Sequence, residues 1–420
     1  MQKKIIIEGG RRLEGSCRIK AAKNSVLPIL ACTVLCSGEV RLHNCPNISD
    51  IRDMLEILRS LGAKVSTHGI ISGDITIDCR YVDKTAVTGD LTSAIRSSIF
   101  LLGPIVTRFG QGIVSSPGGC QIGSRPIDIH LDGLKALGVD IDDQNCLIRC
   151  SVKTGKLVGG DIRLKMPSVG ATENLMMAAV LAVGRTVISN AAKEPEIVDL
   201  ANFINAMGGN VQGAGTSEIV IDGVDGLVGG DFTPIPDRIV AGTYMIGCAM
   251  CGGCVRLEGA NLGHLGALQT VLEKTGVGVF GDSNHIIVES NGNLISPGRI
   301  ETEVYPGFAT DLQAQLMAML AVTKGESIIV ENLFETRFRH AEELTKMGAD
   351  IDVVNKSAII KGVKRLVGAE VNAFDLRGGA AMVLAGLAAN GTTVVSDVHY
   401  IERGYENIVG DLRGLGAEIK

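Results

Sequence analysis

The sequence has 420 residues and a formal net charge of −6, with 45% hydrophobic and 20% charged residues. This length suits two domains better than a single core, and the composition excludes a disordered chain. The acidic balance, an aromatic content of 3% and the absence of Trp argue against a general nucleic-acid-binding protein.

The chain opens without the pattern of a signal peptide, and its apolar runs fall short of the roughly 20 residues that a membrane span needs. We therefore expect a cytoplasmic protein without a membrane partner. Its eleven cysteines form no regular framework, which favours reduced thiols in that compartment.

One pattern recurs along the chain, in which a helix ends, a glycine caps it and a strand begins. Its first copy, LRSLGAKV, spans residues 58–65, and its last, LRGLGAEI, spans residues 412–419. The interval between copies is about 70 residues, so six repeated units are predicted. The capping glycines are Gly62, Gly138, Gly208, Gly276, Gly348 and Gly416.

Each predicted unit also has an apolar helix that runs into a strand, as in 24–44, 173–190 and 378–397. Because these helices are apolar nearly all round, we expect them to be buried. A second helix in each unit, such as 50–62 or 339–348, is amphipathic and is expected to face solvent. The predicted fold is a two-domain inside-out α/β barrel, with helices inside and strands outside.

Two stretches interrupt this array, at residues 15–24 and 228–242. Two prolines mark the second stretch as a linker, with three units before it and three after it. We predict one domain over residues 23–233 and a discontinuous domain over 1–22 plus 234–420, into which the N-terminal strand pairs. The crevice between two such domains is the natural place for a ligand.

The stretch VSSPGGCQIGSRPID, residues 114–128, places Cys120 in a loop of glycines. A cysteine kept only for packing belongs on an apolar face, so this placement favours a chemical role. The cation Arg125, five residues later, should favour the thiolate, which is the nucleophilic form of the side chain.

Charged side chains recur where a strand or loop enters an apolar helix, and in the connecting loops. Each one alone is better explained as solvated surface charge. As a set at equivalent points of a repeat, near helix N-termini that attract anions, they predict an anion-binding site. The residues at helix entries are Lys23, Arg96, Asp311, Asp375 and Arg377, and those in loops are Arg125, Arg337 and Arg403.

Eight segments carry a resemblance that covers nearly the whole chain. They are AAKNSVLPIL (21–30), the long and highly specific segment 96–130, PSVGATEN (167–174), EPEIVDLANF (194–203), YPGFATDLQAQ (305–315), ETRFRHAEEL (335–344), FDLRGG (374–379) and IERGYE (401–406). In these segments the sequence resembles the UDP-N-acetylglucosamine 1-carboxyvinyltransferase family, which has two inside-out α/β domains of three units each.

The resemblance implies an enzyme that transfers the enolpyruvyl group of phosphoenolpyruvate to the 3′-hydroxyl of UDP-N-acetylglucosamine. Phosphate is released, and no metal or organic cofactor takes part. This is the first committed step of peptidoglycan synthesis. The implied partners are the two substrates, with no nucleic acid and no obligate protein partner.

The resemblance also implies roles for individual residues. Cys120 matches the loop cysteine that adds to, or protonates, phosphoenolpyruvate, and Asp311 matches the carboxylate that takes the proton of the sugar hydroxyl. Lys23 and Arg403, with Arg125, match the cluster that holds the phosphate. The other implied substrate contacts are Arg337, Arg377 and Asp375 near phosphoenolpyruvate, Asn24 and Arg96 on the sugar side, and Arg125, Pro126, Ile127, Asp128, Ser168, Val169, Gly170 and Leu333 around the uridine.

Three positions depart from the family pattern. Ala21 stands where Gly or Ser is frequent, and Ala309 replaces a proline that stiffens the loop. Some members have a Lys two residues before the serine of SVGAT, where this chain has Met166. Lys165 lies one residue away and is a weak candidate for a diphosphate ligand.

Other polar residues allow two interpretations. Cys248, Cys251 and Cys254 have metal-like spacing, with His264 as a possible fourth ligand, but the equivalent stretch of another unit also carries cysteines, so packing is favoured. We give the same interpretation, packing in the core, to Cys32, Cys36, Cys146 and Cys150.

His130 fits a substrate-site residue and a structural histidine about equally well. Glu194 and Glu196 are interpreted as the start of an outer helix, with possible loop contacts.

Two other functions compete with the implied one. The sister enolpyruvyl transferase of aromatic biosynthesis has the same inverted fold and uses shikimate 3-phosphate, but the Cys120 loop and the RPID motif argue against it. A non-catalytic protein that binds nucleotide sugars would be expected to lack Cys120 or Asp311, and both are present.

Overall fold

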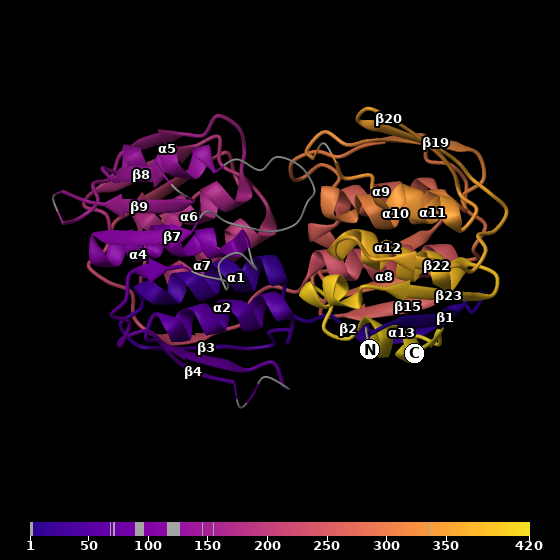
Figure 1. Cartoon of the computed structure of the whole chain (residues 1–420), viewed down its shortest axis with the longest axis horizontal. Helices are drawn as coiled ribbons and strands as arrows, with labels where there is room; N and C mark the ends of the chain where they lie inside the picture. Colours follow the sequence, from indigo (N-terminus) through magenta and orange to yellow (C-terminus); the bar gives the residue numbers. More distant parts are fainter. Residues whose placement is uncertain are drawn as a thin grey trace. The chain divides into compact units, whose positions relative to one another are not determined.

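The computed structural model describes residues 3–67, 69, 72–88, 96–115, 127–144, 146–153, 155–334 and 336–420 (Figure 1). The chain divides into two compact units. The C-terminal unit combines the first 20 residues with Pro236–Lys420, and the N-terminal unit takes the described residues of 21–235. The predicted domain boundaries, 1–22 plus 234–420 and 23–233, stay a prediction.

The described part of each unit contains three four-stranded sheets. In the N-terminal unit the strand orders are β14-β3-β5-β4, β6-β7-β9-β8 and β10-β11-β13-β12. These strands are β3 (Glu39–Leu42), β4 (Lys64–Ser66), β5 (Ile75–Asp78), β6 (Ala86–Val87), β7 (Gln111–Ser115), β8 (Asp140–Gln144), β9 (Leu147–Ser151), β10 (Asp161–Arg163), β11 (Arg185–Ser189), β12 (Val211–Gln212), β13 (Glu218–Asp222) and β14 (Gly230–Phe232).

The C-terminal unit repeats the same sheet plan, with the orders β2-β15-β17-β16, β18-β19-β21-β20 and β22-β23-β1-β24. In every sheet the first two strands run parallel and the other pairs are antiparallel. These strands are β1 (Ile5–Glu8), β2 (Leu13–Arg18), β15 (Gly253–Glu258), β16 (Gly278–Gly281), β17 (His285–Ser290), β18 (Arg299–Glu301), β19 (Glu326–Val330), β20 (Asp350–Val354), β21 (Ser357–Lys361), β22 (Glu370–Asn372), β23 (Thr392–Ser396) and β24 (Glu418–Ile419).

Apolar helices form the interior of each unit, as the sequence predicts. In the C-terminal unit the helices α8, α10 and α12 pack on one another, and all eight residues of α10 are buried. Figure 1 shows them with β19 and β20 on one side and β15 and β1 on the other. The inner helices are α1 (Lys23–Cys32), the 3₁₀ helix η2 (Arg96–Leu101) with α4 (Leu102–Phe109), α6 (Val169–Ala179), α8 (Arg238–Cys251), α10 (Gln313–Leu320) and α12 (Leu376–Ala388).

Amphipathic helices accompany the inner ones, and most bury one face. In α2, for example, Ile51, Met54, Leu55 and Leu58 are buried, because they recur at the helical period. These helices are α2 (Ser49–Ser60), α5 (Asp128–Ala136), α7 (Pro195–Ala206), α9 (Gly266–Lys274), α11 (His340–Lys346) and α13 (Ile408–Gly414). The inside-out α/β architecture expected from the sequence is therefore confirmed.

The six predicted capping glycines share one backbone conformation. Their φ angles lie between 88° and 107°, in the left-handed region that side chains disfavour. At Gly138, Gly208, Gly276 and Gly348 an added Cβ would meet nothing within 4 Å. Glycine is therefore required there by backbone conformation rather than by space.

The first strand closes the C-terminal unit, since β1 pairs antiparallel with β23 and β24, as expected. The stretch 228–242 is more ordered than a plain linker, because it contains β14, which pairs parallel with β3. After β14 the chain enters α8 at Arg238.

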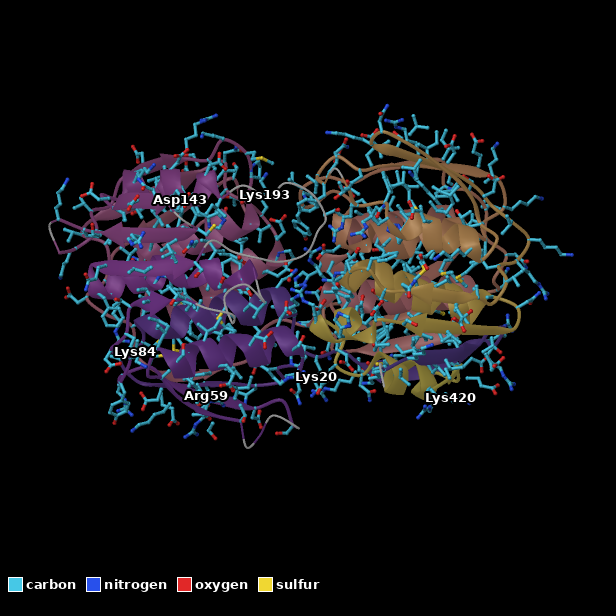
Figure 2. The ribbon with its side chains drawn as sticks, viewed as in Figure 1. Lys20, Arg59, Lys84, Asp143, Lys193 and Lys420 are labelled. Atoms are coloured by element: carbon cyan, nitrogen blue, oxygen red, sulfur yellow. The ribbon has the colours of Figure 1, made fainter. Side chains whose placement is uncertain are left out.

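Charged side chains lie on the outside of the two units, and Lys84 and Lys420 in Figure 2 are exposed examples. Within the described residues, no helix combines the length and apolar character required to cross a membrane.

Candidate active site

A carboxylate held by two arginines lies at the start of an inner helix of the C-terminal unit. Asp311 belongs to the 3₁₀ turn η4 (Thr310–Leu312), which leads directly into α10. Its Oδ1 lies 2.7 Å from Nη2 of Arg337, and its Oδ2 lies 3.1 Å from Nη2 of Arg377. The two arginine side chains are 7% and 5% exposed, so both cations are largely withdrawn from water. We call these three side chains the arginine clamp.

The clamp keeps Asp311 ionised. Burial alone would raise the pKa of this carboxyl, but the guanidinium groups of Arg377 and Arg337 hold it well below its usual range. Two cations around one anion leave an excess of positive charge. Nη1 of Arg377 is buried and has no hydrogen-bond partner among the described residues. The clamp can therefore accept a further anionic group.

Asp375 has a local role beside the clamp. It is the N-cap of α12, and its Oδ1 accepts hydrogen bonds from the backbone N–H groups of Arg377, at 2.9 Å, and Gly378, at 2.8 Å. The sequence places Asp375 among the substrate contacts, whereas this oxygen fixes the helix start that carries Arg377.

His340, at the start of α11, was not identified as a site residue from the sequence. Its side chain is buried beside Asp375 and Arg337, and burial lowers its pKa to about 4. The imidazole is therefore neutral near pH 7. Its Nε2 has no hydrogen-bond partner in the described part of the chain.

In the N-terminal unit, Lys23 is the first residue of α1. Its Nζ lies 2.6 Å from Oδ2 of Asp50 on α2, and the two side chains are 12% and 4% exposed. Among the described residues no side chain caps this helix, so its N-terminal N–H groups add to the positive charge of Lys23. Asn24, the next residue, is half-buried.

Five of the residues expected around the uridine lie near the starts of two packed helices of the N-terminal unit, α5 and α6. Ile127 and Asp128 lie at the start of α5, and Ser168 caps α6, accepting a hydrogen bond from the N–H of Ala171 at 3.4 Å. Val169 then begins α6.

Gly170 shows how closely these two helices approach. A Cβ added at Gly170 would lie 3.3 Å from Cε1 of His130. His130 is buried, and its Nδ1 lies 3.2 Å from Nδ2 of Asn174. A structural hydrogen bond of this histidine is therefore present, one of the two alternatives that the sequence left open.

The weak candidate Lys165 lies on the same surface. Its Nζ is 2.7 Å from Oδ2 of Asp132 and 3.7 Å from Oδ2 of Asp128. Met166, which replaces a lysine of some family members, is 52% exposed.

Several expected site residues lie outside the part that the structure describes. These are Cys120, Arg125 and Pro126. Arg96 is the first residue of η2, but its side chain is not described. Leu333 follows β19, and Arg403 ends the 3₁₀ helix η5 (Val398–Arg403), so both belong to the C-terminal unit.

The cysteine predictions are partly wrong. Cys32, Cys36, Cys150 and Cys248 are buried as expected, but two others expected to pack in the core are exposed. These are Cys146, at the turn between β8 and β9, and Cys254 on β15. No three His, Cys, Asp or Glu side chains among the described residues are placed to hold a metal ion.

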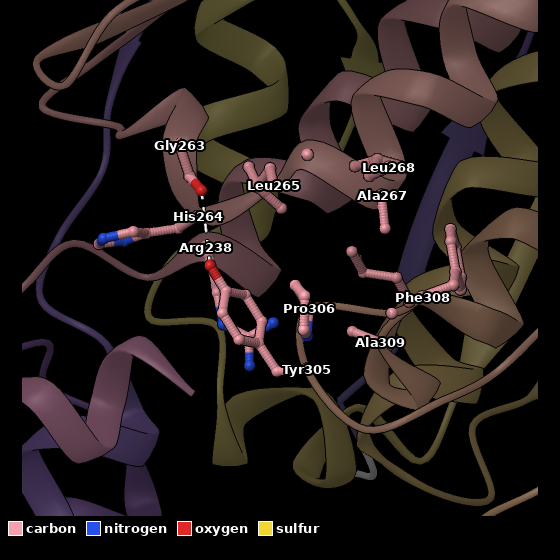
Figure 3. A pocket seen from close by; sticks show the side chains of 13 residues that line it. Arg238, Gly263, His264, Leu265, Ala267, Leu268, Tyr305, Pro306, Phe308 and Ala309 are labelled. Carbon is pink, nitrogen blue, oxygen red and sulfur yellow. Dashed lines mark hydrogen bonds between the residues drawn. The ribbon is translucent and has the colours of Figure 1, made fainter. Parts of the chain in front are cut away.

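A small pocket of about 70 Å³ lies in the C-terminal unit beside the loop that precedes Asp311 (Figure 3). Arg238, His264 and Tyr305 contribute its polar groups, and Tyr305 donates a hydrogen bond of 3.5 Å to the carbonyl of Gly263. Ala309 lines the same pocket and has φ −65°, the angle that a proline would fix. The departure at Ala309 therefore leaves the backbone in a proline-like conformation.

Comparison with known proteins places this geometry in a family. The sequence profile of the family described as EPSP synthase (3-phosphoshikimate 1-carboxyvinyltransferase) matches residues 7–412. UDP-N-acetylglucosamine 1-carboxyvinyltransferase 2 of Caldanaerobacter subterraneus is 48% identical over 99% of each chain. UDP-N-acetylglucosamine 1-carboxyvinyltransferase of Coxiella burnetii is 46% identical over 99% of this chain and 95% of its own.

Solved structures agree in fold. The crystal structure of the enolpyruvyl transferase NikO from Streptomyces tendae has a TM-score of 0.89 and 25% identity, covering 100% of this chain and 99% of its own. EPSP synthase from Acinetobacter baumannii has a TM-score of 0.78 at 17% identity with the same coverage, which shows the fold alone. By its sequence and its fold, the chain belongs to the UDP-N-acetylglucosamine 1-carboxyvinyltransferases, within the wider EPSP synthase family.

Proposed function

We propose that this chain transfers the enolpyruvyl group of phosphoenolpyruvate to the 3′-hydroxyl of UDP-N-acetylglucosamine and releases phosphate. The observation that carries the proposal is the arginine clamp, two buried cations around Asp311 with an unused donor on Arg377. A cationic site with a carboxylate at its centre, in which both arginines are largely withdrawn from water, suits a reaction between an anionic substrate and a hydroxyl group. Relatives that are 46% and 48% identical over nearly the whole chain bear the name of this activity.

The reaction has two steps. The hydroxyl oxygen attacks C2 of phosphoenolpyruvate while C3 gains a proton, which gives a tetrahedral adduct that still carries the phosphate. The adduct then loses a proton from C3, the bond between C2 and the phosphate oxygen breaks, and the double bond forms again. The products are the enolpyruvyl ether and inorganic phosphate.

We assign Asp311 as the base that accepts the hydroxyl proton. In the absence of substrate its lowered pKa makes it a weak base, because both arginines stabilise its charge. When the carboxylate of phosphoenolpyruvate engages Arg337 and Arg377, their stabilisation of Asp311 falls and its basicity rises. Asp311 therefore becomes an effective base only when phosphoenolpyruvate, which supplies the enolpyruvyl group, is bound.

The remaining roles follow the family pattern. Cys120 delivers the proton to C3 or adds covalently to the substrate. Lys23 and Arg403, with Arg125, stabilise the phosphate as it leaves. Asn24 and Arg96 contact the sugar, and Leu333 contacts the uridine together with the residues near the starts of α5 and α6.

We also propose that the enzyme is cytoplasmic and that its partners are its two substrates. The cytoplasmic location is supported by the cysteines of the described residues, which are all free thiols.

Shikimate 3-phosphate is the acceptor in the competing reaction. The EPSP synthase structures support only the shared fold at 17–18% identity, so they do not favour this acceptor. A non-catalytic protein would have no need of a clamped carboxylate at the mouth of an inner helix. Both arginines are present and oriented towards Asp311, which favours an enzyme.

A phosphate-release assay tests the proposal. With phosphoenolpyruvate and UDP-N-acetylglucosamine together, we expect steady release of phosphate, and none when either is omitted. Release with shikimate 3-phosphate instead of the nucleotide sugar would transfer the assignment to the competing reaction. No release with either acceptor would support the non-catalytic alternative.

A further inference from the structure

Glu331 is a buried carboxylate outside the clamp that no role in the proposed reaction uses. It follows β19 directly and is 1% exposed. Four donors meet its two oxygens. Oε2 accepts from the hydroxyl of Thr310 at 2.8 Å, and Oε1 accepts from the hydroxyl of Thr302 at 2.8 Å and from the N–H groups of Leu333 at 2.9 Å and Phe334 at 3.2 Å.

We propose that Glu331 is a positioning residue for the enolpyruvyl transfer, which sets the arginine clamp through Thr310 and sets the Leu333 loop through backbone hydrogen bonds. The proposal rests on the proposed function, because it assigns a purpose to a contact of Asp311 and Arg337.

The first connection from Glu331 to the arginine clamp depends on the hydroxyl group of Thr310. Thr310 gives its only proton to Glu331, so a lone pair of the same oxygen is left for Nη1 of Arg337, which donates to it at 2.8 Å. Nη2 of that arginine then reaches Asp311 at 2.7 Å. Because a carboxylate can only accept hydrogen bonds, and four donors face the oxygens of Glu331, this residue fixes the direction of the whole chain of hydrogen bonds.

The second connection reaches the same arginine from another side. By accepting the N–H groups of Leu333 and Phe334, Glu331 fixes the chain as it leaves β19. The guanidinium carbon of Arg337 lies 5.2 Å from the centre of the Phe334 ring. Both connections therefore converge on Arg337, and one of them also places Leu333, the residue assigned to the uridine.

Comparison with other units shows that this carboxylate is not a general feature of the repeat. Six residues after the glycine that precedes the strand, three other units have Asn44, Asn190 and Asp397, each with φ 58°. Glu331 occupies this position after Gly325 and is absent from the residues with positive φ. Where those three units turn the chain with a left-handed residue, the unit that carries the clamp holds it with a buried carboxylate.

The kinetic test compares four variants. We expect Glu331→Gln to lower kcat by about 10-fold or more, because small displacements of a catalytic group carry costs of this size. Thr310→Val should give a similar loss, whereas Thr310→Ser keeps the hydroxyl and should stay within about 2-fold of wild type. If both residues act through Arg337, the double variant Glu331→Gln with Thr310→Val should be no worse than the poorer single variant.

A matched control separates positioning from stability. Glu343 lies in the same unit, is also 1% exposed and accepts the N–H of Asn372 at 2.9 Å. Glu343→Gln should lower Tm without lowering kcat. Wild-type kcat and KM in Glu331→Gln, or losses that multiply in the double variant, would overturn the proposal.

A second measurement does not depend on activity. In ¹³C-aspartate NMR titrations, Glu331→Gln and Thr310→Val should both raise the pKa of Asp311, because Arg337 is released from its place. Thr310→Ser should leave this pKa unchanged. An unchanged pKa in all three variants would reject the positioning role even if the chain proved inactive, whereas an inactive wild type with the expected shifts would reject only the proposed function.

Discussion

The inner helices of the two units begin in chemically different ways. In the C-terminal unit, Asp311 is already enclosed by Arg337 and Arg377, so that its negative charge is stabilised and an excess of positive charge remains. In the N-terminal unit, Lys23 pairs with Asp50 across two helices, and Ser168 caps α6 with a neutral hydroxyl. Under the proposed function, the same repeated framework would supply the acid–base centre in one unit and the helix starts that bind the anion and the nucleotide in the other.

The largest effect is expected when the charge of Asp311, the proposed base, is removed. We expect Asp311→Asn to lower kcat by about 10²-fold or more, the size typical of a positioned acid–base group, while substrate binding largely survives. Steady-state kinetics with both substrates measure the loss.

Asp411→Asn is the matched control, since Asp411 accepts a hydrogen bond from Tyr244 at 2.6 Å in the same unit and has no assigned role in the reaction. Turnover near wild type in Asp311→Asn would remove Asp311 from the mechanism.

Selective alkylation of Cys120 tests the reactive loop. Burial raises the pKa of Cys248, Cys251 and Cys36 to about 12, so these thiols should not react at neutral pH. A small anionic epoxide of the fosfomycin type should label Cys120, and faster when UDP-N-acetylglucosamine is bound. Peptide mass mapping reads out the site.

Substitutions at the same position sharpen the test. Cys120→Ser should lose labelling and most activity, whereas Cys120→Asp should lose labelling and keep turnover, because a carboxylic acid can still deliver a proton. The exposed Cys146 and Cys254 report background labelling. Modification spread over the buried thiols, or a labelled enzyme with full activity, would contradict the assignment.

The helix start of the N-terminal unit should affect the binding of phosphoenolpyruvate as well as the departure of its phosphate. We expect Lys23→Gln to raise the KM for phosphoenolpyruvate by about 10-fold, in line with the loss of one charge-assisted hydrogen bond. Lys20→Gln is the control, because Lys20 lies three residues earlier and pairs with Glu406 at 3.4 Å near the surface. Equal effects of the two variants would point to general charge rather than to a bound phosphate.

The smallest expected effect concerns the stability of the N-terminal unit. Glu173 on α6 is 1% exposed, and both its oxygens have no hydrogen-bond partner within the described residues. Burial, and then the charges of Glu196 and Glu194, raise its pKa well above the usual value. A raised folded-state pKa gives stability that is complete below the unfolded-state pKa and is lost as pH rises through the folded-state pKa.

Glu173→Gln should therefore raise Tm by roughly 2–4 °C at alkaline pH and have little effect in acid. Thermal melts across pH measure the difference, with the exposed Glu218→Gln as control. A variant that is less stable than wild type at every pH would show that the carboxylate of Glu173 is stabilising instead.

The repeat could be predicted from the sequence because backbone requirements leave a residue-level mark. Gly138 and its equivalents need a left-handed conformation, and the all-apolar helices need burial, so period and architecture were both predictable. Contacts made by common residue types could not be predicted from the sequence. Glu331 is one glutamate among many charged residues, and only folding brings it to Thr310.

The candidate site, too, could be predicted from the sequence only in part. Asp311, Arg337 and Arg377 were expected from the resemblance, but their ion pairs depend on three separate segments meeting in space. Cys254 was predicted to pack because the equivalent stretch of another unit also carries cysteines, yet β15 alternates its faces and exposes it. The only signal available for His340 was its place three residues after Arg337.

Mass spectrometry of the acceptor after reaction tests the central claim most directly. Wild-type protein with phosphoenolpyruvate should convert UDP-N-acetylglucosamine into its enolpyruvyl ether, with one phosphate released for each ether formed, and Asp311→Asn should form far less of it. An unchanged nucleotide sugar, or conversion of shikimate 3-phosphate in its place, would contradict the account.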